Sequence, residues 1–124
     1  MPEIKTILLV DDEFLLLTLM EDLLSERFSV ISAPGGTQAI DLLNAEPERK
    51  FHGLVTDIRM PGASGWDVAR KARELHPDIA VIYVTGDSSA DWRDNGVPGS
   101  KIFGKPVKLE DLLETLTGML TTPA

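Results

Sequence analysis

Residues 7–14 read ILLVDDEF, so the apolar run Ile7–Val10 leads directly into the acidic residues Asp11–Glu13. An apolar run without alternating polar residues is typical of a parallel strand that is covered on both faces. In parallel α/β sheets, ligands bind beyond the carboxyl ends of the strands. The stretch therefore predicts both a fold class and the place of a functional site, at the rim where this strand ends.

The composition excludes several classes of protein. The 124 residues suit one domain with its own core, so we expect a single domain over residues 1–124. A net charge of −8 disfavours nucleic acid as a partner, because phosphate binding needs clustered Lys and Arg. The absence of cysteine excludes disulfides and cysteine zinc sites. The absence of cysteine and the lack of a signal-peptide pattern at the N-terminus together indicate a cytoplasmic protein.

No stretch is apolar enough to predict a membrane span. The longest apolar run, Phe14–Met20, is interrupted by Thr18 and falls short of the roughly 20 residues that cross a bilayer. We therefore expect no membrane partner.

Short apolar runs alternate with amphipathic helical patterns along the chain, which predicts right-handed crossovers and a doubly wound parallel α/β sheet. In the first helical pattern, Leu16, Leu19, Met20 and Leu23 share one face, which we expect to pack on the sheet. The predicted strands are Ile7–Val10, Phe28–Ile31, Leu54–Asp57, Ala80–Val84 and Ile102–Phe103, and the predicted helices are Glu13–Arg27, Thr37–Ala45, Gly65–Leu75 and Leu109–Leu120.

One crossover is weak. Residues 87–100 read DSSADWRDNGVPGS, with the turn signals Asn95-Gly96 and Pro98-Gly99 and no apolar stripe. We expect a fourth helix of about two turns at most, or a mobile segment.

Polar residues end four of the predicted strands. Asp11 and Asp12 follow the first, Asp57 ends the third, Thr85 follows the fourth and Lys105 follows the fifth. These side chains are expected to converge at one rim of the sheet. Crowded carboxylates repel one another, and a hard cation with oxygen ligands removes that cost, so Mg²⁺ is the expected cofactor.

A metal, an ammonium and a hydroxyl around one carboxylate make a phosphoryl-transfer site, where catalysis is mostly positioning and charge neutralisation. Asp57 would be the nucleophile and form an acyl phosphate. For Asp11, Asp12 and Glu13, the alternative interpretation is helix N-capping.

The chain resembles the receiver domain of two-component response regulators over almost its whole length. VDDE at residues 10–13 resembles the acidic pair of that family, and TDIRMPGASGWD at 56–67 resembles its phosphoacceptor loop. VTG at 84–86 and GKP at 104–106 resemble its switch hydroxyl and its lysine-proline pair. The resemblance implies a flavodoxin-like sheet of five parallel strands in the order 2-1-3-4-5.

The resemblance also implies roles for the rim residues. Asp57 would accept a phosphoryl group from a histidine kinase or a histidine phosphotransfer protein. Asp12, Asp57 and the backbone carbonyl of Arg59 would bind Mg²⁺ directly, and Asp11 would bind it through a water. The domain would signal by binding proteins, as a monomer or weak dimer, and would catalyse only its own phosphorylation and dephosphorylation.

On the basic and hydroxyl side of the site, Lys105 would pair with Asp57 and then with the phosphoryl group, and Thr85 would move to bond that group. The Lys105–Pro106 peptide is expected to be cis. Family members usually carry an aromatic switch residue three positions before the lysine, where this chain has Ile102. Phe103 should point to the other face, so the coupling between threonine and aromatic ring would be absent or altered.

Two further expectations concern phosphoryl lifetime and docking. Arg59 and Asp87 lie two residues after Asp57 and Thr85, and an ion pair between them would obstruct hydrolytic water. Exposed apolar residues often mark interfaces. The expected docking residues for the kinase are Phe14, Leu15, Leu17 and Pro106.

Other functions fit the sequence less well. An Asp-nucleophile phosphohydrolase of the haloacid-dehalogenase type wants a second acid two residues after the nucleophile, where this chain has Arg59. A flavodoxin-like FMN carrier needs a Ser/Thr-rich phosphate loop after the first strand, where this chain has acids. A receiver that acts as a phosphate sink or scaffold stays open as an alternative.

Overall fold

The protein folds as a five-stranded, wholly parallel sheet in the order β2-β1-β3-β4-β5. The computed structural model describes residues 4–86 and 91–121. Both the predicted fold class and the predicted strand order are confirmed. The strands are β1 (Thr6–Val10), β2 (Ser29–Ala33), β3 (Gly53–Asp57), β4 (Ala80–Thr85) and β5 (Lys101–Gly104).

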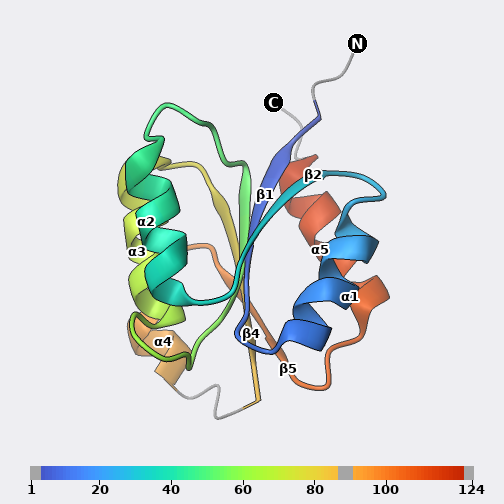
Figure 1. Cartoon of the computed structure of the whole chain (residues 1–124). Coiled ribbons are helices and arrows are strands. Elements are labelled where there is room, and N and C mark those ends of the chain that lie inside the picture. The colour runs from blue at the N-terminus through green and yellow to red at the C-terminus, as the bar shows by residue number, and fades with distance from the viewer. Residues whose placement is uncertain (1–3, 87–90, 122–124) are drawn as a thin grey trace.

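Helices cover both faces of the sheet (Figure 1). One face carries α2, α3 and α4, and the other carries α1 and α5. Among the described residues, none of the helices is long and apolar enough to cross a membrane. The helices are α1 (Phe14–Leu24), α2 (Gly36–Ala45), α3 (Gly65–Leu75), α4 (Trp92–Asn95) and α5 (Leu109–Leu120).

Most boundaries of the elements lie within one residue of the sequence prediction, and the largest differences are in β2 and α1. The second strand begins one residue later than predicted and runs to Ala33. The first helix ends at Leu24 rather than Arg27. The fourth helix is a single turn, which agrees with the weak pattern there, although residues 87–90 of that segment lie outside the described part of the chain.

The core consists of two apolar clusters, one on each face of the sheet. Successive side chains of a strand point to opposite faces. Leu8 and Val10 of β1 therefore pack with Tyr83 beneath α2 and α3, whereas Ile7 and Leu9 pack beneath α1 and α5. Because both clusters are apolar, the polar side chains of the candidate site lie at the ends of the strands.

The predicted sheet-facing side of α1 is confirmed for Met20 and wrong for Leu19. Leu17, Met20 and Leu24 are the buried residues, whereas Leu19 is 46% exposed. Leu16 and Leu23 are half-buried at the edge of the same cluster. The physical reason is that residues 14–17 are all apolar, so the pattern itself does not set the rotation of the helix.

A close backbone approach positions the loop that follows β3. A Cβ atom at Gly65 would lie 2.0 Å from the backbone oxygen of Asp57, so only glycine fits where α3 begins. The Gly65 amide donates a hydrogen bond of 2.8 Å to the carbonyl of Ile58. Ser64 and Asp67 form a reciprocal capping box at this end of α3. The helix start is thereby held directly against the end of β3.

Candidate functional site

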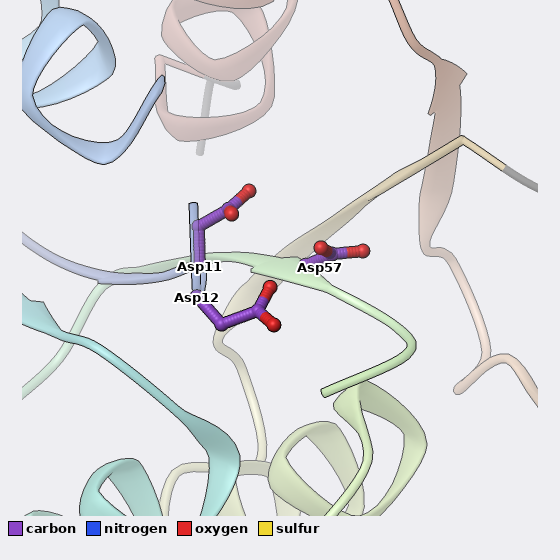
Figure 2. Close-up of side chains that lie close together, drawn as sticks. All are labelled: Asp11, Asp12 and Asp57. Atoms are coloured by element: carbon purple, nitrogen blue, oxygen red, sulfur yellow. The ribbon is translucent and has the colours of Figure 1, made fainter. Parts of the chain in front are cut away.

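Three aspartates gather at the carboxyl ends of β1 and β3 (Figure 2). Asp11 and Asp12 follow β1, and Asp57 is the last residue of β3. One carboxylate oxygen from each residue lies within 4.8 Å of one from each of the others. The predicted convergence of these acids at one rim is therefore confirmed.

The environment of the acids fits a hard cation. Asp11 is fully buried and Asp57 is 6% exposed, whereas Asp12 is exposed. Oδ1 of Asp11 accepts a hydrogen bond of 2.7 Å from the Glu13 amide, but Oδ2 is buried without a hydrogen-bond partner. Burial raises the pKa of Asp11, and the neighbouring Asp57 carboxylate adds to the rise. An unsatisfied carboxylate oxygen inside a cluster of acids is what Mg²⁺, with its preference for oxygen ligands, would relieve.

Lys105 places a positive charge among these acids. Its Nζ lies 3.0 Å from Oδ2 of Asp57 and 3.5 Å from Oδ2 of Asp11. The other oxygen of Asp57, Oδ1, accepts a hydrogen bond of 2.7 Å from the Ile58 amide, which fixes the orientation of the carboxylate. The phosphoacceptor candidate is thus held between a backbone donor and an ammonium group.

Sequence reasoning missed a third acid at Lys105. Nζ of Lys105 lies 2.6 Å from Oε1 of Glu13, closer than to either aspartate. Glu13 occupies the N-cap position of α1, but its side chain makes no capping hydrogen bond, so the capping interpretation is wrong for this residue. Burial alone would lower the pKa of Lys105, but hydrogen bonds to Glu13 and Asp57 outweigh it and raise the pKa above the ordinary lysine value. Lys105 is therefore a firmly charged ammonium.

Thr85 closes the rim on the side of β4. It is 3% exposed, and its backbone oxygen accepts a hydrogen bond of 2.7 Å from the Lys105 amide. A cavity of about 290 Å³ opens beside it towards α3 and α4. The residues lining this cavity are Ile58, Arg59, Met60, Ser64, Trp66, Thr85 and Asp91.

Ile102 stands where an aromatic switch residue was expected, and it packs against the cluster beneath α2 and α3. Phe103 packs against the opposite cluster, as predicted. On the face of Ile102, the Tyr83 ring lies 4.7 Å from the Trp66 ring, and its hydroxyl accepts a hydrogen bond from the Val97 amide. The two rings in contact on this face therefore come from α3 and β4. The Lys105–Pro106 peptide is cis, as expected.

Arg59 is exposed and lies at the mouth of the cavity beside Thr85. Its expected partner Asp87 falls outside the described residues, so the predicted ion pair between them stays a prediction.

The expected docking residues separate into two groups. Phe14 is 81% exposed and Leu15 is 72% exposed, and Pro106 is exposed as well. Leu17 is only 7% exposed and belongs to the core beneath α1, so its assignment to a docking patch was wrong. A groove of about 610 Å³ runs beside the exposed residues. It is lined by Glu13, Leu15, Leu16, Leu19, Lys105, Pro106, Val107 and Leu109.

Comparison with known proteins identifies the family. Residues 7–117 match the family described as "Response regulator receiver domain". The response regulator receiver protein CpdR of Brucella abortus is 34% identical over 119 residues, which cover 94% of this chain and 97% of CpdR. The sensor kinase CckA of the same organism is 32% identical over 119 residues, but these are only 12% of that protein.

Solved structures agree with this assignment. A response regulator receiver protein from Sinorhizobium medicae superimposes with a TM-score of 0.90 at 38% identity, covering 97% of both chains. The receiver domain of the hybrid histidine kinase CckA gives a TM-score of 0.78 at 25% identity, covering 94% of this chain and 99% of that domain. With the acidic rim, the lysine and the threonine in place, the chain belongs to the response regulator receiver domain family of two-component signalling.

Proposed function

We propose that this receiver domain accepts a phosphoryl group on Asp57 from a phosphohistidine and passes the signal on by binding another protein. The observation that supports this best is the Lys105 ammonium 3.0 Å from Asp57, at a rim where Asp11 and Asp12 complete a cluster of acids. In this proposal the domain modifies no substrate except its own Asp57, and it acts in the cytoplasm without binding nucleic acid or membranes.

The proposed cofactor is Mg²⁺. Asp12, Asp57 and the backbone carbonyl of Arg59 would hold it directly, and Asp11 would hold it through a water. The buried Oδ2 of Asp11 supports this assignment, because it accepts no hydrogen bond and its ion-pair contact with Lys105 is long, at 3.5 Å. When bound, the ion would neutralise charge that builds up on the transferred phosphoryl oxygens.

In the proposed transfer, a carboxylate oxygen of Asp57 forms a bond to phosphorus while the phosphorus–nitrogen bond of the donor histidine breaks. The bonding electrons stay on the imidazole nitrogen, which takes a proton from solvent. The Ile58 amide keeps the Asp57 carboxylate in a fixed orientation, and Lys105 supplies a positive charge to the incoming group. Thr85 lies on the adjacent strand, from which its hydroxyl would bond the transferred group.

We propose that the phosphohistidine partner, a histidine kinase or a histidine phosphotransfer protein, docks on the exposed apolar start of α1. Phe14 and Leu15 are large apolar side chains in contact with solvent, and Pro106 lies along the adjoining groove. Exposed apolar residues beside a reactive site are typical of an interface. The domain itself would be a monomer or weak dimer.

The test uses Mg²⁺ and beryllofluoride, which mimics a phosphoryl group on a carboxylate. Trp66 lines the cavity beside Thr85, and Trp92 lies in α4, so their fluorescence reports on this face of the domain. We expect saturable fluorescence and amide NMR changes that require Mg²⁺ and that disappear in Asp57→Asn. A protein that gives the same response with and without Asp57, or none at all, would contradict the proposal.

A further inference from the structure

We propose that Glu13 is a positioning residue that keeps the Lys105 ammonium beside Asp57 when a divalent cation occupies the acidic cluster. The proposal rests on the proposed function, because it assigns a task to the same site. It starts from the shortest contact at the rim, the 2.6 Å between Oε1 of Glu13 and Nζ of Lys105.

The contact joins two segments that are far apart in the chain and that are each held in place. The Glu13 amide donates to Oδ1 of Asp11 at 2.7 Å, which fixes the backbone from which the Glu13 side chain starts. The Lys105 amide donates to the Thr85 carbonyl at 2.7 Å, which fixes the lysine backbone at the end of β5. Because both backbones are fixed, the Glu13 and Lys105 side chains are already placed close enough to form their contact.

The three acids around Lys105 differ in what a cation would do to them. Asp11 and Asp57 belong to the acidic cluster that fits a metal, whereas Glu13 does not. A divalent cation on the cluster would cancel the negative charge that attracts Lys105 there, and it would repel the ammonium directly. Glu13 keeps its full charge, so its attraction for Lys105 persists when that of the aspartates is lost.

Exposure agrees with this division of roles. The side chain of Lys105 is 15% exposed, and those of its aspartate partners are 8% exposed or less. The Glu13 side chain is 61% exposed and spans from the solvent edge to the ammonium. An exposed ion pair contributes little to stability, so this contact matters mainly for where the lysine points.

The first test reads the position of Lys105 directly. The two ε-methylene protons of a lysine have different chemical shifts when the side chain is held, and they average when it rotates freely. We expect distinct shifts in the wild-type protein with and without Mg²⁺, and averaged shifts in Glu13→Gln once Mg²⁺ is added. Asp22→Asn removes an exposed acid of α1, the helix that Glu13 precedes, and should behave as the wild type.

The second test is a double-mutant cycle with Lys105→Met, read out as the rate of labelling by a small acyl phosphate. Glu13→Gln should slow labelling roughly three- to tenfold, less than the 10²–10³-fold typical of losing a direct donor. It should have no effect in the Lys105→Met background, because Glu13 acts through the lysine.

Several results would overturn the inference. These are distinct ε-proton shifts in Glu13→Gln with Mg²⁺, an equal loss of labelling in Asp22→Asn, faster labelling in Glu13→Gln, or an undiminished effect in the Lys105→Met background. A wild-type protein that binds Mg²⁺ but is never labelled would instead contradict the proposed function. In that case the ε-proton shifts still show whether Glu13 holds the Lys105 side chain in place when Mg²⁺ is bound.

Discussion

Leu15 and Leu17 stand two residues apart in the first turns of α1, yet Leu15 is 72% exposed and Leu17 is 7% exposed. Leu17 packs into the cluster beneath α1 and α5, and Leu15 borders the groove beside Pro106. Leu17 therefore contributes to the core, whereas Leu15 is available for docking. Substitutions at the two positions should affect stability and partner binding separately.

Leu17→Ala should lower the free energy of unfolding by about 2–4 kcal/mol, because it removes buried methyl groups and leaves a cavity. Leu15→Glu should change stability by no more than about 0.5 kcal/mol, because the site faces solvent. Urea unfolding measures both. We expect Leu15→Glu to slow phosphoryl transfer from a histidine phosphotransfer protein while labelling by a small acyl phosphate stays unchanged. Equal transfer rates would remove Leu15 from the docking surface.

Asp11→Asn should make the metal-free protein more stable by about 1 kcal/mol, since removing a fully buried charge from a cluster of acids outweighs the loss of its 3.5 Å ion pair with Lys105. It should also remove the stabilisation by Mg²⁺. For the wild type, that stabilisation is about 2.7 kcal/mol at 100 times the Kd. Urea unfolding with Mg²⁺ and with a chelator measures both effects. A variant less stable than the wild type in chelator would show that Asp11 supports the fold instead.

Gly65→Ala should destabilise the protein by about 1–3 kcal/mol, because the added Cβ would collide with the backbone oxygen of Asp57. Since the collision is with the phosphoacceptor residue itself, labelling of Asp57 should slow as well. Gly118→Ala is the matched control, because a Cβ there meets no atom within 4 Å. Thermal unfolding of both variants measures the change in stability, and labelling by acyl phosphate measures the change in rate at Asp57.

His76 should make stability depend on pH. Burial lowers its pKa below the ordinary histidine value of about 6.5, and Lys50 adds to the effect. The folded state thus favours the neutral ring, whose stabilisation is complete above that value and is lost as pH falls through the lowered pKa. Unfolding at pH 7.5 and 5.0 should therefore show a smaller loss for His76→Gln than for the wild type. His52 is present in both proteins, so an equal loss would exclude His76 as the cause.

Arg59→Ala should shorten the lifetime of the phosphoryl group, because Arg59 stands at the mouth of the cavity that adjoins Thr85. The measurement is the decay of labelled protein after the donor is removed, with Arg93→Ala as a surface control on α4. An unchanged or longer half-life would show that Arg59 does not restrict hydrolytic water.

Much of the site was predictable because parallel strands end at one rim. Asp57, Thr85 and Lys105 could be placed together from strand ends alone, without knowledge of side-chain contacts. The short fourth helix followed from its glycine and proline turn signals, and the opposite directions of Ile102 and Phe103 followed from strand alternation.

The rest depended on details that the sequence does not encode locally. Four consecutive apolar residues begin α1, so burial of Leu17 rather than Leu19 is decided by the packing of the helix on α5 and the sheet. The contact between Glu13 and Lys105 depends on two loops that meet in space, 92 residues apart in the chain. An acid just before a helix also has an ordinary capping role, which hid this contact.

The backbone hydrogen bond between Lys105 and Thr85 has a mechanical consequence. It ties the last residue of β4 to the residue that follows β5, so a shift of either backbone pulls on the other. A negatively charged group that binds at Asp57 and attracts the Lys105 ammonium should therefore also shift β4, the strand that carries the Thr85 hydroxyl. The Lys105 ammonium and the Thr85 hydroxyl should therefore shift together when a charged group binds at Asp57.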